Sequence, residues 1–344
     1  MPGQYRFSFG PWNLHEGADP FGPPVRPTVA FAEKLGLYKR LGFDAVQFHD
    51  DDAVPELEEL APEEVAAKAG AMKSMLDGEG LVAEFVAPRL WEDPRGIDGG
   101  FTANDPACRR WAMDRFKRCV DIAHALDTRL TVLWLAREGT YIRESKNAID
   151  AYEQLLEAIN EILEYDRHVE VAIEPKPNEP MDLAYVPTIG HALALAERTV
   201  DSSRVGGLIE TAHALLAGLD PSDEMAFALS MGKLWSVHLN DQNGLKFDQD
   251  KTFGAANLRA AYNQVRVLEL ADYAGTERFV GLDVKAMRTQ PAGAAHKHLA
   301  NSRAIFLKLV DKFRSFPIDF ERQCIADRDY EELEMAVIRH LLGE

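Results

Sequence analysis

Short apolar runs alternate with longer amphipathic segments along most of the chain. Apolar runs of about four to eight residues between turn residues are typical of buried strands, and apolar residues recurring every three or four positions are typical of helices packed on a sheet. The predicted strands span 6–9, 44–48, 81–86, 130–134, 169–173, 205–209, 234–239 and 278–282. The predicted helices span 30–41, 62–76, 106–126, 148–165, 188–198, a segment after Asp220, 257–273 and 294–313. Eight consecutive strand–helix pairs predict an α/β fold, a (β/α)₈ TIM barrel.

The end of the chain falls outside this repeat. We expect residues 1–315 to form the catalytic barrel and residues 316–344 to form a short C-terminal helical arm, with one helix at 331–342. The arm is expected to pack on the barrel or on a neighbouring subunit. The Pro- and Gly-rich segment 20–27 predicts a protruding loop after the first strand.

Composition narrows the class of partner. The chain has 344 residues, 46% of them hydrophobic, which is enough for one large core. Its net charge of −18 repels the phosphates of nucleic acids and of anionic membranes. The three cysteines lack metal-site spacing, and no apolar stretch approaches the ~18 residues of a membrane helix. We therefore expect a soluble cytoplasmic protein with no nucleic-acid or membrane partner.

Acidic and histidine side chains stand at the ends of four successive predicted strands. Glu174, Glu210 and Asp283 follow the fifth, sixth and eighth strands, and His238 lies near the end of the seventh. One carboxylate after a strand is usually a helix cap or a solvated loop charge. Because the carboxyl ends of barrel strands form a ring around one mouth, however, four such residues in succession predict a shared site.

A second group of candidate ligands adjoins the first. His213 follows Glu210 by three residues, and a polar loop after the seventh strand carries Asp248 and Asp250. Glu210 can bridge the two groups, so two adjacent cations are the simplest interpretation. The ligands are mostly oxygen, which favours Mg²⁺, Mn²⁺ or Co²⁺ over a structural zinc ion.

Six motifs in the chain are specific enough to indicate a family. They are Phe48-His49-Asp50-Asp51-Asp52, Gly99-Gly100-Phe101-Thr102-Ala103-Asn104-Asp105, Trp134 with Arg137-Glu138-Gly139, Ile173-Glu174-Pro175-Lys176-Pro177-Asn178-Glu179-Pro180, Glu210-Thr211-Ala212-His213, and Lys246-Phe247-Asp248-Gln249-Asp250. Over about residues 7–288 the chain resembles xylose isomerase, in its shorter bacterial form. The resemblance implies a metal-dependent aldose–ketose isomerase of carbohydrate metabolism.

The resemblance also implies roles for individual residues. The first metal, matched by Glu174, Glu210 and Asp283, would hold two hydroxyl oxygens of the opened sugar. The second metal would lie beside the C1–C2 bond, where the hydride shift occurs; its matching ligands are Glu210, His213, Asp248 and Asp250.

Residues around the metals match further family positions. Lys176 matches a lysine that hydrogen-bonds the carbonyl oxygen, and His49 with Asp52 matches the pair that opens the sugar ring. The aromatic walls correspond to Trp12 and Trp134, and Phe21 matches a phenylalanine inserted from a neighbouring subunit. A homo-oligomer is expected, and the short arm leaves dimer and tetramer equally open.

The chain departs from the family pattern at its metal site and its pocket. His238 stands where the family has an aspartate ligand, which favours Mn²⁺ or Co²⁺ over Mg²⁺. A histidine at this position also occurs in rhamnose isomerases of broad substrate range and in ketose 3-epimerases. Arg89 replaces a polar uncharged residue and Trp91 a phenylalanine, so Arg89 is expected to meet either a substrate carboxylate or a bulkier polyol.

Three functions are compared on these residues. A metal-dependent sugar isomerase that uses a 1,2-hydride shift after ring opening accounts for the largest number of them. A ketose 3-epimerase is the alternative, with Glu174 and Asp283 as the carboxylates that flank C3. A non-enzymatic sugar-binding protein on the same barrel is less favoured, because the lysine, the ring-opening pair and the second metal group are all present.

Overall fold

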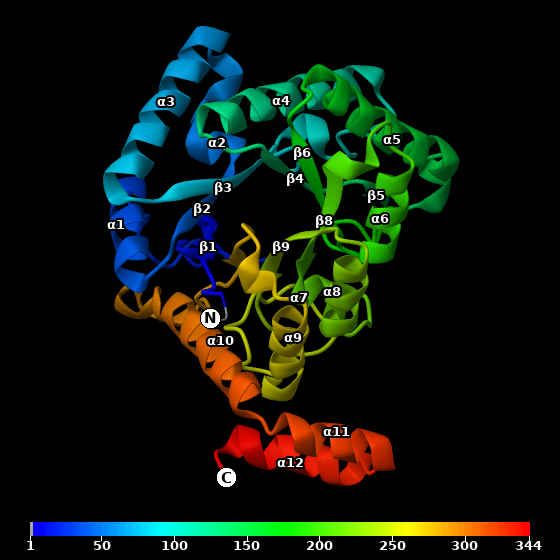
Figure 1. Ribbon diagram of the computed structural model, residues 1–344. Helices are drawn as coiled ribbons and strands as arrows, with labels where there is room; N and C mark the ends of the chain where they lie inside the picture. Colours follow the sequence, from blue (N-terminus) through cyan, green and yellow to red (C-terminus); the bar gives the residue numbers. More distant parts are fainter. Residues whose placement is uncertain (1–2) are drawn as a thin grey trace.

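Eight parallel strands form a closed barrel in the computed structural model, which describes residues 3–344 (Figure 1). Around the barrel the strands follow the order β1-β10-β9-β8-β6-β4-β3-β2. They are β1 (Phe7–Phe9), β2 (Ala45–His49), β3 (Val82–Ala87), β4 (Leu130–Trp134), β6 (Glu170–Glu174), β8 (Val205–Glu210), β9 (Leu234–Leu239) and β10 (Val280–Leu282). The predicted TIM barrel is confirmed.

Helices surround the barrel and cover its outer face. The longer ones are α1 (Phe31–Leu41), α3 (Pro62–Glu79), α4 (Pro106–Ala125), α5 (Ala148–Tyr165), α6 (Ile189–Glu197), α8 (Pro221–Ser230), α9 (Leu258–Leu270) and α10 (Lys297–Ser315). Asp105 and Asp220 each cap a helix that has proline at its first position, as the sequence predicts. Within residues 3–344 no helix is both long enough and apolar enough to cross a membrane.

Short elements sit at the mouth of the barrel, where the sequence predicts only loops. They are α2 (Asp50–Ala53), α7 (Thr211–Leu216) and the antiparallel pair β5 (Gly139–Thr140) and β7 (Leu183–Ala184). The strands β2, β3, β6 and β8 also extend one residue further than predicted on this side. Glu174 pairs with Trp134 and Glu210 pairs with His238 in the sheet, so both carboxylates are the last residues of their strands.

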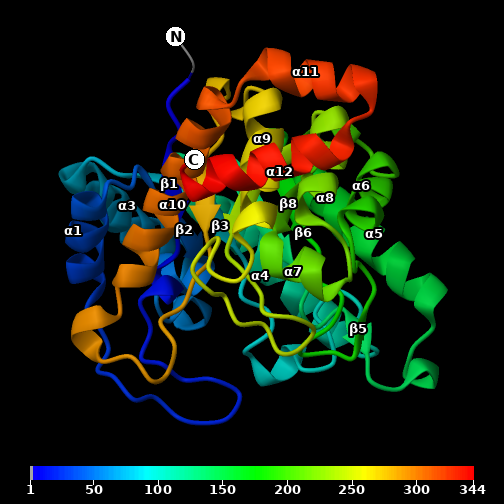
Figure 2. The same cartoon turned by 90° about the horizontal axis from the view of Figure 1, so that it is seen from below.

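The C-terminal arm contains two helices, α11 (Ile318–Asp327) and α12 (Tyr330–Leu342), which pack against each other (Figures 1 and 2). The prediction of a single helix in this arm is therefore wrong. Arg328, in the left-handed region at φ 58°, reverses the chain between them. An ion pair of 2.5 Å joins Arg266 of α9 to Glu321 of α11. The division of the chain into two domains stays a prediction.

The buried His298 on α10 makes the stability of the fold depend on pH. Its Nε2 lies 2.9 Å from the backbone oxygen of Asn13, to which it must donate. Burial lowers the pKa of His298 from 6.5 to about 4. In the unfolded chain His298 binds a proton more readily than in the folded protein. The buried, neutral His298 therefore contributes its full stability to the fold above pH ~6.5, and this contribution is lost as the pH falls towards 4.

We predict that His298→Gln, whose amide can still donate to Asn13, flattens the pH dependence of unfolding between pH 6.5 and 4. The difference should reach about 3 kcal/mol across this range. Urea denaturation at several pH values measures it, with His168→Gln on the surface as the matched control. A slope unchanged from that of the parent chain would mean that His298 is not the titrating group.

Candidate metal centre

The carboxyl ends of β6, β8, β9 and β10 bring the seven predicted ligands together. Their oxygen and nitrogen atoms form three groups, each with all atoms within 4.8 Å of one another. The groups are Glu174, Glu210 and His213; Glu210, His238 and Asp283; and Glu210, Asp248 and Asp250. Glu210 belongs to all three, so it occupies the centre of the cluster.

His238 forms one side of the cluster. Its Nδ1 lies 3.4 Å from Glu174, 3.7 Å from Glu210 and 3.9 Å from Asp283. The loop after β1 orients Asp283, whose Oδ1 accepts hydrogen bonds from Trp12 Nε1 at 3.0 Å and Asn13 Nδ2 at 3.2 Å. The other oxygen of Asp283 is thereby left facing His238.

His213, on α7, also belongs to the cluster, and its Nδ1 lies 3.6 Å from Glu174 Oε1. Its Nε2 lies 3.3 Å from Glu210 Oε1 and 3.1 Å from Asp248 Oδ2. The amide of Asn240 donates to both Glu210, at 2.9 Å, and Asp250, at 3.0 Å. Asn240 therefore ties the strand-end carboxylate to the loop that carries the two aspartates.

Several buried polar atoms in the cluster lack a hydrogen-bond partner among residues 3–344. They are His213 Nδ1, His238 Nδ1, His238 Nε2 and Asp248 Oδ1. Burying such atoms without a partner is costly, and native structures usually satisfy them with protein, water or an ion. Imidazole nitrogens beside carboxylate oxygens are suitable ligands for a divalent metal ion, so the cluster fits such an ion.

The carboxylates also carry more negative charge than their surroundings balance. Burial raises the pKa of Glu210 well above its usual range, and the charge of Asp248 raises it further. Burial and the neighbouring Asp248 likewise raise the pKa of Asp250 to about 8. For Glu174 the effect of burial is outweighed by His238, which lowers its pKa to about 2. A cation among these groups would relieve the repulsion.

A cavity of about 440 Å³ opens above the cluster. Trp12, Trp91 and Trp134 contribute to its walls. Lys176, buried in the wall, places Nζ 2.9 Å from Asp248 Oδ2 and 5.2 Å from the centre of the Trp134 ring. Burial alone would lower the pKa of Lys176, but the charges of Asp248 and Glu210 raise it, so the side chain is an ammonium at neutral pH.

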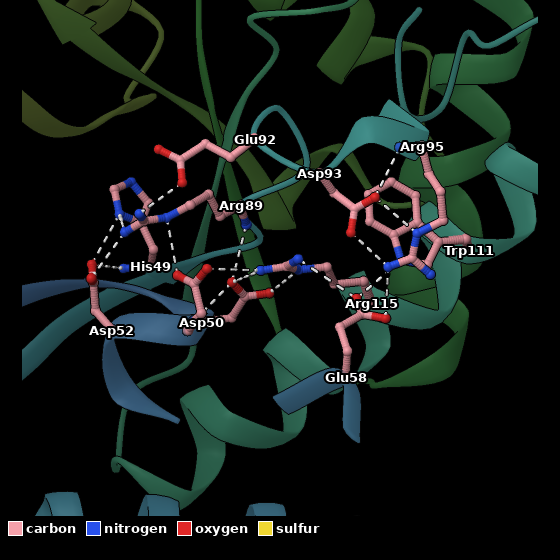
Figure 3. A network of polar contacts seen from close by, with 11 residues as sticks. His49, Asp50, Asp52, Glu58, Arg89, Glu92, Asp93, Arg95, Trp111 and Arg115 are labelled. Carbon is pink, nitrogen blue, oxygen red and sulfur yellow. Dashed lines mark hydrogen bonds and ion pairs between the residues drawn. The ribbon is translucent and has the colours of Figure 1, made fainter. Parts of the chain in front are cut away.

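The predicted ring-opening pair lies in the wall of the same cavity. His49 ends β2, and its Nδ1 is 2.9 Å from Asp52 Oδ2 on α2. The centre of the His49 ring lies 4.4 Å from that of the Trp12 ring and 5.1 Å from that of the Trp91 ring. Arg89, just after β3, contacts both His49 and Asp52 (Figure 3).

Phe21 lies at the rim, outside the set of residues that line the cavity. Its side chain is 77% exposed, and its ring centre is 5.3 Å from that of Phe247, which does line the cavity. This position leaves Phe21 free to meet another molecule. The entry of a partner's phenylalanine into the cavity stays a prediction.

Some residues that hold the cluster were not identified from the sequence. Besides Asn13 and Asn240, Lys285 pairs with Asp250, and Glu179 accepts a hydrogen bond from the backbone nitrogen of Asp248 at 3.0 Å. Asn240 and Lys285 each lie two residues beyond a predicted ligand, which was the available signal. An asparagine that faces solvent in a loop and one that bridges two carboxylates cannot be told apart in sequence, because they differ only in the direction of the side chain.

Known structures share the fold. A D-psicose 3-epimerase with D-tagatose from Clostridium cellulolyticum H10 has 14% identity and a TM-score of 0.61, covering 89% of this chain and 98% of that one. The IolI protein with a bound zinc atom has 13% identity and a TM-score of 0.62, covering 90% and 100%. A putative xylose isomerase from Rhodospirillum rubrum ATCC 11170 has 17% identity and a TM-score of 0.64, covering 91% and 100%.

The sequence itself matches one family over most of the barrel. Residues 35–300 match the family described as xylose isomerase-like TIM barrel. The matched segment begins in α1 and ends in α10, so it includes every barrel strand except β1, and with them all four strands whose ends form the metal cluster. The chain therefore belongs to the xylose isomerase-like TIM barrel family.

Proposed function

We propose that the protein is a metal-dependent sugar isomerase that interconverts an aldose and its ketose by a 1,2-hydride shift after ring opening. One observation carries this proposal: three ligand groups share Glu210, and the ammonium of Lys176 lies beside them in a cavity with indole walls. Hydride transfer between two carbons requires a polarised carbonyl and an ionised neighbouring hydroxyl. Two adjacent cation positions suit that requirement.

The residues would divide between two ions, Mn²⁺, Mg²⁺ or Co²⁺. One position would be held by Glu174, Glu210, His238 and Asp283, and the other by Glu210, His213, Asp248 and Asp250. When bound, divalent cations supply Lewis acidity, which polarises a carbonyl and lowers the pKa of an adjacent hydroxyl. His238 makes the first position richer in nitrogen, which favours Mn²⁺ or Co²⁺.

The chain's own groups bind and shield the sugar. Lys176, held charged by its acidic neighbours, is placed to donate a hydrogen bond to the carbonyl oxygen of the opened sugar. The indoles of Trp12 and Trp134 keep water from the reacting carbons. His49, which lies in the cavity wall near Trp12 and Trp91, would contact a sugar oxygen during ring opening. We further propose that the working form is a homo-oligomer.

The alternative is a ketose 3-epimerase, which one structural neighbour suggests by its name. Epimerisation at C3 needs two carboxylates that remove and return a proton, and Glu174 and Asp283 lie 3.4 and 3.9 Å from the same His238 nitrogen. The epimerase reaction gives Asp248 and Asp250, the second group of candidate ligands, no function. The isomerase uses both groups, so it is the better account.

Turnover in heavy water separates the two reactions. The enzyme would be assayed with Mn²⁺, Mg²⁺ and Co²⁺ against a panel of aldoses and ketoses, and the products examined by NMR. A hydride shift leaves the product largely free of deuterium at C1 and C2. Deuterium at C3 would identify an epimerase instead, and a panel without any turnover would favour a sugar-binding protein.

The nitrogen ligand allows a direct test of metal preference. We predict that His238→Asp raises the affinity for Mg²⁺ relative to Mn²⁺ by about tenfold, because a carboxylate replaces the imidazole at the first position. Titration calorimetry with each metal measures the ratio, with His124→Asp on the surface of α4 as the control. An unchanged ratio would exclude His238 as a ligand.

A further inference from the structure

Lys285 lies in the loop after β10 and lines the same cavity as the metal cluster. Its ammonium forms an ion pair with Oδ2 of Asp250, one of the candidate ligands. The backbone nitrogen of Lys285 also donates to the backbone oxygen of Asp250 at 2.8 Å. A side-chain contact and a backbone contact therefore tie the loop after β9 to the loop after β10.

Both carboxylate oxygens of the buried Asp250 already have a partner. Lys285 covers Oδ2, and Oδ1 accepts a hydrogen bond from Asn240 Nδ2 at 3.0 Å. A carboxylate oxygen can accept from an amide and still bind a cation, because it has a second lone pair. An ammonium at Oδ2, in contrast, carries the same sign of charge as a metal ion. The Lys285 side chain is 40% exposed, so its ammonium can move into solvent when a cation approaches.

A second lysine contacts the same group of ligands. Lys176 places Nζ 2.9 Å from Oδ2 of Asp248. The cation position that this group would form is called the second position, and its proposed ligands are Glu210, His213, Asp248 and Asp250. Two of its three carboxylates therefore already pair with an ammonium of the protein.

The other position, called the first, has no such partner. Within residues 3–344, Glu174 and Asp283 form ion pairs with histidines but with no lysine or arginine. The groups that orient Asp283 are Trp12 and Asn13, which are neutral donors. Neutral donors hold a carboxylate in place without cancelling its charge. The two positions therefore differ in charge although they share one glutamate.

We infer that Lys285 sets the affinity of the second position: its ammonium covers Asp250 and repels an incoming cation, so that the first position fills first and the second cation is released more easily. This inference rests on the proposed division of the ligands between two cations. Like charges repel strongly in a buried site, where water screens them little. A divalent ion feels this repulsion about twice as strongly as a proton that competes for Asp250, so the direction of the effect holds at neutral pH.

Titration calorimetry of the metal-free full-length protein with Mn²⁺ tests the role of Lys285. We expect two binding steps in the parent protein, the second at least about tenfold weaker than the first. Lys285→Met should strengthen the second step by about tenfold and leave the first unchanged, because one of two opposing charges is removed. Lys285→Arg, which keeps the charge, should keep the second step weak. Lys246→Met, exposed on the loop that carries Asp250, is the matched control for the change in net charge.

The rate at which Mn²⁺ leaves the protein gives a second readout that needs no turnover. A chelating dye would be added to the loaded protein and the appearance of its metal complex followed by stopped flow. We expect one equivalent to leave the parent at least about tenfold faster than the other, and the two rates to approach each other in Lys285→Met. Crystals grown with one equivalent of Mn²⁺ should show the anomalous peak beside Glu174 and Asp283.

Two equally strong steps in the parent protein would overturn the inference, even if Lys285→Met failed to fold. An unchanged or weaker second step in Lys285→Met would also overturn it, because Lys285 would then not oppose the cation. A parent protein that binds one equivalent and a variant that binds two would support it. A parent protein that binds no Mn²⁺ would instead contradict the proposed metal-dependent function.

Discussion

Replacing Glu210 with glutamine is expected to lower kcat by a factor of about 10³ or more, because the carboxylate belongs to every ligand group. Both proposed cation positions would lose a negative ligand in this variant, and an amide nitrogen would enter the cluster. The shape of the side chain is kept, and its oxygen can still accept from Asn240. The loss should therefore come from metal binding and not from unfolding.

The thermal stability of metal-free Glu210→Gln is expected to rise, whereas its activity is expected to fall. Burial and Asp248 raise the pKa of Glu210, so its charged form is unfavourable in the metal-free protein at neutral pH. The variant should then melt at a higher temperature than the parent without metal, and gain less from added Mn²⁺. Glu164→Gln, exposed on α5, is the matched control. A variant that binds two equivalents of Mn²⁺ as tightly as the parent would exclude Glu210 as a shared ligand.

Replacing Lys176 with methionine is expected to lower kcat by about 10²- to 10³-fold while the metal affinity is kept or increased. Removing a single donor that stabilises developing charge typically has an effect of this size. The ammonium also pairs with Asp248 at 2.9 Å, so its removal frees that carboxylate for a cation. Calorimetry with Mn²⁺ and steady-state kinetics separate the two effects.

Lys308→Met on the outer face of α10 is the control for Lys176→Met. A variant of Lys176 with normal kcat and a raised KM would mean that the lysine binds the substrate and the transition state equally. A variant with weaker metal binding would contradict the geometry in which Lys176 competes with a cation for Asp248.

The fold could be predicted because apolar residues recur at regular intervals in its strands and helices. Buried parallel strands and amphipathic helices differ in their repeat, and the order of eight pairs specifies the barrel and the edge where strand ends meet. Glu174, Glu210 and Asp283 could be assigned to that edge from their positions alone. The first helix of the arm, α11, was missed, because the segment 318–327 is short and only one of its residues, Cys324, is buried.

The arrangement of the site depends on side-chain directions, which sequence periodicity does not contain. Arg89 could be recognised as an unusual charge near the pocket, but not as a side chain enclosed by Asp51, Asp52 and Glu92. Asn240 stands two residues after His238, but its bridge between Glu210 and Asp250 could not be predicted for the same reason.

Anomalous diffraction from crystals grown with Mn²⁺ tests the central claim most directly. We predict two peaks on either side of Glu210, one within bonding distance of His238 and Asp283 and the other within bonding distance of His213 and Asp248. A map without a peak in the cluster, or with these side chains turned away from one another, would contradict a two-metal sugar isomerase.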